Sequence, residues 1–143
     1  MNFAGTTESG VVSTMLAVCA SRRSRDWEAI TADVSQAFLN AELVEGSDHP
    51  VFVKSPAGEV WRLEKALYGL RAAPKAWQRT LRKIMLESKC WAPMPKHGST
   101  FVEIGGTGTT TAHVDDLMIC DTKETREGLL SYLQSRLKLT RIQ

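Results

Sequence analysis

The apolar residues of this chain recur with helical spacing in three segments. The first runs from about Glu8 to Arg22, and its apolar face is expected to hold Val11, Val12, Met15, Leu16 and Cys19. The second is predicted to begin at Pro74, since proline suits the first helical turn, and to end near Cys90, before two further prolines. The apolar stripe of this second helix consists of Trp77, Leu81, Ile84 and Met85.

The third helical segment follows Asp121. Asp121 is predicted to be the N-cap of this helix, because Glu124, three residues later, resembles the second member of a capping box. The buried face of the helix is expected to consist of Leu129, Leu130, Leu133 and Leu137.

Shorter apolar runs between turn signals predict strands in the first half of the chain. One strand is expected from Trp27 to Val34, and the residues from Ser35 to Leu43 are expected to form a short helix or turn. The segment from Pro50 to Leu63 is predicted to be a β-hairpin around the turn signal Ser55-Pro56-Ala57-Gly58.

Three further strands are predicted in the second half. Two of them, at about Thr100–Ile104 and Thr109–Val114, are joined through a Gly-Gly pair. The third, Leu117–Cys120, follows after only Asp115 and Asp116, so we expect a tight hairpin with both aspartates at its tip. The order helix, strand, hairpin, helix, hairpin and helix predicts an α+β fold whose helices pack on one face of an antiparallel sheet.

Length and composition fit one globular domain. A chain of 143 residues can bury a substantial core, and no apolar run approaches the roughly 20 residues that a membrane-spanning helix needs. No signal peptide is recognisable, which predicts a cytoplasmic or nuclear protein without a membrane partner. The three cysteines, Cys19, Cys90 and Cys120, fit neither a disulfide framework nor a zinc site.

The distribution of charge is more informative than its sum. A net charge of +2 does not by itself indicate a nucleic-acid partner. Arg71, Lys75, Arg79 and Arg82 nevertheless recur at steps of four and three residues, which predicts a basic stripe along the second helix. Such a stripe can follow a phosphate backbone or be an ordinary solvated helix face. In either case, helical periodicity places Arg79 and Arg82 outward and Trp77 inward.

Asp115 and Asp116 are adjacent acids inside an otherwise apolar segment. Two neighbouring carboxylates repel each other and are costly without a cation, and Mg²⁺ prefers carboxylate oxygens together with substrate phosphates. Asp33 lies at the end of another apolar strand and is the candidate for a third carboxylate. The alternative is that Asp115 and Asp116 simply form a polar hairpin turn.

Three blocks of the sequence resemble copia-type reverse transcriptases of LTR retrotransposons. The first runs from Asp33 to Asn40 and has Ala-Phe-Leu-Asn after the aspartate. The second and most distinctive runs from Lys65 to Arg71 and continues to Trp77, and the third, Val114–Leu117, is similar to the catalytic turn of the family. The blocks occur in the order of the family. The resemblance therefore implies a single partial reverse transcriptase domain over residues 1–143, made of the palm with part of the fingers.

The resemblance also implies roles for individual residues. Asp33, Asp115 and Asp116 match the catalytic, metal-binding triad, which would hold two Mg²⁺ or Mn²⁺ ions. Phe38 matches the aromatic residue beneath the sugar of the incoming nucleotide, and His113 stands at the primer end where the family usually has tyrosine. The residues implied in nucleotide or template binding are Phe38, Tyr68, Gly69, Arg71 and Pro74.

The implied activity is RNA-directed DNA synthesis, a nucleotidyl transfer templated by RNA or DNA. The implied partners are a template–primer duplex, dNTPs, and the integrase and RNase H domains of an intact Pol polyprotein. The basic fingers segment and the thumb of the family are expected to lie outside these 143 residues, which predicts little or no activity for the chain alone. The alternatives are an inactive relic that binds nucleic acid weakly and, disfavoured because no further acidic motif accompanies the triad, an unrelated two-metal nuclease.

Overall fold

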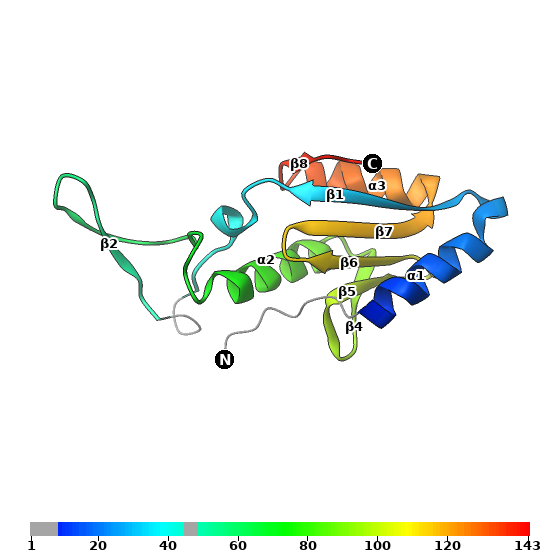
Figure 1. Ribbon diagram of the computed structural model, residues 1–143, viewed down its shortest axis with the longest axis horizontal. Coiled ribbons are helices and arrows are strands. Elements are labelled where there is room, and N and C mark those ends of the chain that lie inside the picture. Colours follow the sequence, from blue (N-terminus) through cyan, green and yellow to red (C-terminus); the bar gives the residue numbers. More distant parts are fainter. Residues whose placement is uncertain (1–8, 45–48) are drawn as a thin grey trace.

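The computed structural model describes residues 9–44 and 49–143 of the chain. In this part, six strands form one antiparallel sheet in the order β4-β5-β6-β7-β1-β8, and a separate hairpin, β2–β3, projects from one end of the molecule (Figure 1). The helices are α1 (Ser9–Ser21), α2 (Ala73–Glu87) and α3 (Lys123–Gln134), with short 3-10 helices η1 (Arg23–Arg25) and η2 (Ala37–Asn40). The strands are β1 (Trp27–Val34), β2 (Phe52–Lys54), β3 (Val60–Arg62), β4 (Trp91–Met94), β5 (His97–Glu103), β6 (Thr109–His113), β7 (Asp116–Thr122) and β8 (Leu139–Thr140).

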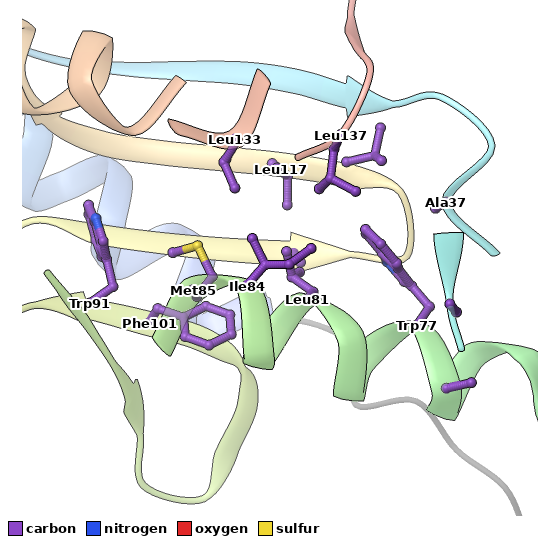
Figure 2. Packing of buried hydrophobic residues seen from close by; sticks show 14 of the residues in the cluster. Ala37, Trp77, Leu81, Ile84, Met85, Trp91, Phe101, Leu117, Leu133 and Leu137 are labelled. Atoms are coloured by element: carbon purple, nitrogen blue, oxygen red, sulfur yellow. The ribbon is translucent and has the colours of Figure 1, made fainter. Parts of the chain in front are cut away.

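The main hydrophobic core lies between one face of the sheet and the helices α2 and α3. The side chains of Leu117 and Ile119, both in β7, point into this core, and each is at most 1% exposed. Residues i and i+2 of a strand point to the same face of the sheet, so Leu117 and Ile119 lie together on the core face of β7. The predicted stripe of α2 is buried against them, and Leu133 and Leu137 close the core from the side of α3 (Figure 2).

Helix α1 covers the opposite face of the sheet, so the expectation that all helices pack on one face is wrong (Figure 1). The residues of β7 that point away from the main core, Met118 and Cys120, are apolar too, and they pack with Met15 and Cys19 of α1. Because both faces of β7 are apolar, helices must pack against both faces of the sheet. Leu16, which we expected on the buried face of α1, is 46% exposed, and Val18 packs into this second cluster.

Most predicted elements are confirmed. Strand β1 spans the predicted residues, the β2–β3 hairpin surrounds the predicted turn, and α2 begins with Pro74 in its first turn. The register of α2 is also confirmed: Trp77 is 2% exposed, Arg82 is exposed, and the guanidinium of Arg79 reaches the surface carbonyl of Glu42 at 3.0 Å. The three cysteines are free thiols. No helix in the described ranges is long and apolar enough to cross a membrane.

Two strands were missed. The prolines at positions 93 and 95 predict the end of the second helix and no strand, whereas residues Trp91–Met94 form the edge strand β4. An edge strand tolerates proline because one side of its backbone needs no hydrogen-bonding partner, and the pairing with β5 shifts register between Pro93 and Met94. The two-residue strand β8 was too short to leave a periodic signal.

The predicted N-cap of the last helix is wrong. Thr122 is the N-cap, and its hydroxyl accepts a hydrogen bond from the backbone N–H of Thr125. Asp121 instead belongs to β7 and is 1% exposed. One of its carboxylate oxygens accepts a hydrogen bond from the Thr122 N–H, and the other has no hydrogen-bond partner within residues 9–44 and 49–143. Burial raises the pKa of Asp121 to about 6; the bond from the Thr122 backbone opposes this rise, and neighbouring Glu103 adds to it.

The buried Asp121 carboxyl predicts a pH-dependent stability. Because its folded pKa is raised above the ordinary 3.8, its contribution is most favourable below pH 3.8 and is lost as pH rises through 6. Asp121→Asn keeps the shape and removes the charge. We expect the free energy of unfolding of this variant to exceed that of the parent by up to about 3 kcal/mol at pH 8.

Urea unfolding between pH 4 and pH 8 measures this difference. The advantage of Asp121→Asn should shrink as pH falls through 6, whereas Glu124→Gln, which removes an exposed acid of α3, should show no such trend. A pH-independent difference between Asp121→Asn and the parent chain would contradict the raised pKa.

Candidate active site

The register of β1 against β7 places two of the three predicted aspartates side by side. Asp33 is the direct antiparallel partner of Asp116, and directly opposite side chains of an antiparallel pair lie on the same face. This is the face away from the main core, since the neighbouring pair Ala32 and Leu117 is buried. Asp116 is exposed and the side chain of Asp33 is 26% exposed, so both carboxylates are accessible.

The turn between β6 and β7 carries Asp115 but not Asp116, so the prediction that both aspartates lie at its tip is wrong: Asp116 is the first residue of β7. His113 pairs with Asp116 across the hairpin, which leaves Val114 and Asp115 as a two-residue loop. Val114 has a φ of +55°, unusual for a β-branched residue and costing on the order of 1–2 kcal/mol. The carbonyl of Asp115 accepts a hydrogen bond from the Val34 N–H at 2.7 Å, which ties the tip of the hairpin to β1.

The two carboxylates influence each other electrostatically. A hydrogen bond with Asp33 raises the pKa of Asp116 above its ordinary 3.8; burial and the charges of Asp33 and Asp115 raise it further, and His113 opposes the shift. Two acids this close favour a shared proton or a bound cation, because either one removes their repulsion.

Arg141 places a positive charge beside Asp33, a contact that no local pattern in the sequence predicts. Its guanidinium donates to a carboxylate oxygen of Asp33 at 3.3 Å, and its own side chain is 80% exposed. Arg141 follows β8, whose pairing with β1 brings the C-terminal segment to this end of the sheet. An ion pair this exposed contributes little to stability, so a divalent cation can replace Arg141 at low cost.

The carboxylates suit a hard cation such as Mg²⁺, which binds oxygen ligands. Asp33 and Asp116 supply two such groups on one open face, and Asp115 is the next residue along the chain. Within the described ranges, however, no three His, Cys, Asp or Glu side chains are already close enough together to hold a metal ion. The structure thus brings together two of the three predicted ligands, and the part played by Asp115 stays a prediction.

The predicted nucleotide-binding residues lie on the segment between β1 and α2 and, for Pro74, in the first turn of α2. The rings of Phe38 and Tyr68 are 5.0 Å apart between centroids. They meet because the chain after η2 runs beside the chain before α2: the Ala66 N–H donates to the Ala41 carbonyl at 2.8 Å. Both alanines are fully buried, and small side chains allow this close approach.

The remaining predicted contacts follow Tyr68 along the same segment. Gly69 has a φ of +89°, a conformation that favours glycine. Arg71 is exposed, and Pro74 is half-buried in the first turn of α2. Tyr68 is itself 58% exposed, so this segment offers an accessible aromatic and a cation to a ligand.

Comparison with known proteins assigns the family. The family model described as reverse transcriptase (RNA-dependent DNA polymerase) matches residues 2–142, so the chain belongs to this family. It is a partial retrotransposon reverse transcriptase, in agreement with the resemblance of its three sequence blocks.

The curated relatives are transposon proteins. Over 66 residues, or 43% of this chain, it is 41% and 42% identical to the retrovirus-related Pol polyproteins from transposons RE1 and RE2 of Arabidopsis thaliana. Over 96 residues, or 61% of the chain, it is 30% identical to the putative transposon Ty5-1 protein of Saccharomyces cerevisiae. The matched regions span 4% of each plant polyprotein and 30% of the yeast protein.

The contact between the two aspartates predicts a measurable coupling. Asp33→Asn removes the carboxyl whose hydrogen bond is the largest cause of the raised Asp116 pKa and whose charge adds to it, so the pKa of Asp116 should fall toward 3.8. Carboxyl carbon shifts of Asp116, followed by NMR across a pH titration, measure the change. Glu28→Gln, which removes an exposed acid elsewhere on β1, is the control, and an equal shift in both variants would argue against direct contact.

Proposed function

We propose that this chain is the catalytic palm, with part of the fingers, of an RNA-directed DNA polymerase that works within a retrotransposon Pol polyprotein. The observation that carries the proposal is the cross-strand pair of Asp33 and Asp116, which is accessible on the sheet face that α1 covers elsewhere and lies beside a strained turn. In this assignment the six-stranded sheet is the palm and the β2–β3 hairpin belongs to the fingers.

Each candidate residue has a distinct task in this reaction. Asp33, Asp115 and Asp116 would hold two divalent ions, Mg²⁺ or Mn²⁺, which would supply activation of the primer 3′-hydroxyl and charge neutralisation at the phosphates. Phe38 lies under the sugar of the incoming dNTP. The segment that contains Tyr68, Gly69, Arg71 and Pro74 contacts the nucleotide and template.

The remaining steps depend on positioning. Phosphoryl transfer requires the attacking and leaving oxygens to be aligned, and the primer end must therefore be held at the turn that begins with His113. The template–primer is RNA or DNA, and integrase and RNase H domains of the polyprotein complete the replication cycle in the cytoplasm or nucleus.

A second candidate function is an inactive relic that binds nucleic acid weakly. The observation that favours it is His113, an imidazole where related catalytic turns begin with a phenol, at the residue that pairs with Asp116. In this case the fold and the acid pair persist, but the primer end is no longer positioned for transfer.

Primer extension distinguishes the two candidates. We expect the 143 residues alone to give little or no product with Mg²⁺ or Mn²⁺, because the matched region spans only 4% of each plant polyprotein and phosphoryl transfer needs primer, template and dNTP held in one geometry. A version extended at both ends with the flanking regions of a full-length relative should extend the primer. Asp33→Asn and Asp116→Asn should reduce the rate of that extended version at least 100-fold, consistent with the loss of charge stabilisation at a catalytic centre.

Glu124→Gln is the matched control, since it removes one acid from an exposed position on α3. An extended version that is inactive with His113 but gains activity on His113→Tyr would favour the relic. Extension that survives Asp116→Asn would contradict the proposed catalytic centre.

A further inference from the structure

Trp77 makes a contact that links α2 to the turn that contains Asp115 and immediately precedes Asp116. Its indole Nε1–H donates a hydrogen bond to the carbonyl of Val114 at 2.6 Å. Trp77 is 2% exposed, and a buried indole N–H needs a partner because water cannot reach it. Figure 2 shows Trp77 at the end of α2 that lies next to the turn between β6 and β7.

The bonded carbonyl belongs to the strained residue of the turn. Val114 has a positive φ, and such a conformation persists only where the surroundings enforce it. The next carbonyl, that of Asp115, is held by the Val34 N–H from the other side. The two peptide groups of the loop are therefore anchored independently, one by a side chain of α2 and the other by the backbone of β1.

Helix α2 is a suitable anchor because its position is set by the core. Leu81 and Met85 lie on the same face as Trp77, at steps of four residues, and are 3% and 1% exposed. Movement of the turn away from Asp33 would break the Trp77 bond or pull a large ring out of a close-packed interior, and both are costly.

We propose that Trp77 is a positioning residue, whose indole N–H fixes the Val114 turn so that Asp115 and Asp116 face Asp33 and bind a divalent cation. This inference rests on the proposed function in taking the acids to be cation ligands. Trp77 itself does not touch the substrate. It holds the backbone that presents the ligands, so its loss weakens cation binding without removing any ligand.

Trp77→Phe is the direct test, since it keeps an aromatic ring in the core and deletes the N–H. Trp91→Phe is the matched control: Trp91 is also buried, at 3% exposure, but lies toward the far end of α2 (Figure 2). Mn²⁺ affinity, measured on the 143-residue chain by calorimetry, should fall five- to tenfold in Trp77→Phe and less than twofold in Trp91→Phe. Equal losses in both variants, or none in Trp77→Phe, would overturn the inference.

Amide hydrogen exchange gives a reading that does not depend on the metal. The Val34 N–H, which bonds to the turn, should exchange at least tenfold faster in Trp77→Phe, while the core amide of Ile119 changes equally little in both variants. If the parent chain binds no Mn²⁺, the proposed function fails, and the Val34 amide still decides whether Trp77 holds the turn. Unchanged Val34 exchange in Trp77→Phe would refute that role.

The unaltered chain provides a third reading, should Trp77→Phe fail to fold. At saturating Mg²⁺ the indole N–H resonance of Trp77 should shift, because its acceptor lies in the cation-binding turn, and that of Trp91 should stay in place. A Trp77 resonance that does not respond to bound Mg²⁺ would also overturn the inference.

Discussion

The antiparallel register between β1 and β7 is the constraint on which the rest of the site depends. This register pairs Asp33 with Asp116. The neighbouring pair, Ala32 of β1 and Leu117 of β7, is buried. Because side chains alternate between faces, a slip of one residue would bury an aspartate and expose the core residues of the strand. The hydrophobic effect therefore fixes the placement of the acids: burying one face of the strands obliges the carboxylates to lie together on the other.

The same arrangement concentrates unfavourable features at one end of the sheet. Asp33 and Asp116 repel, and Val114 adopts a positive φ. Compensation comes from contacts distant in the sequence: the Arg141 guanidinium beside Asp33, and the Trp77 indole on the Val114 carbonyl. Strain and repulsion held in place by a rigid core are the features expected where a protein binds a charged ligand.

Local sequence patterns predicted what depends on local physics. The bounds of β1 and the buried face of α2 followed from periodicity, and two acids within an apolar run marked the turn after β6. Periodicity could not show which face of the sheet α1 covers, because that depends on both sides of β7 being apolar. Pro93 argued against a strand, yet it lies in the edge strand β4. The spacing of Asp121 and Glu124 predicted a helix cap, whereas Asp121 is a buried residue of β7. The contacts of Trp77 and Arg141 cross the fold, so no local pattern could reveal them.

The central claim is that Asp33 and Asp116 form a cation site at one end of β7. Paramagnetic broadening by Mn²⁺ tests it directly, because β7 carries a second acid, Asp121, near Glu103 at its other end. The account predicts that the backbone amides of Thr31, Asp33 and Asp116 broaden at the lowest Mn²⁺ concentrations, while those of Glu103 and Asp121 stay sharp. Broadening that begins at Glu103 and Asp121, or that spreads evenly over the exposed acids, would contradict it.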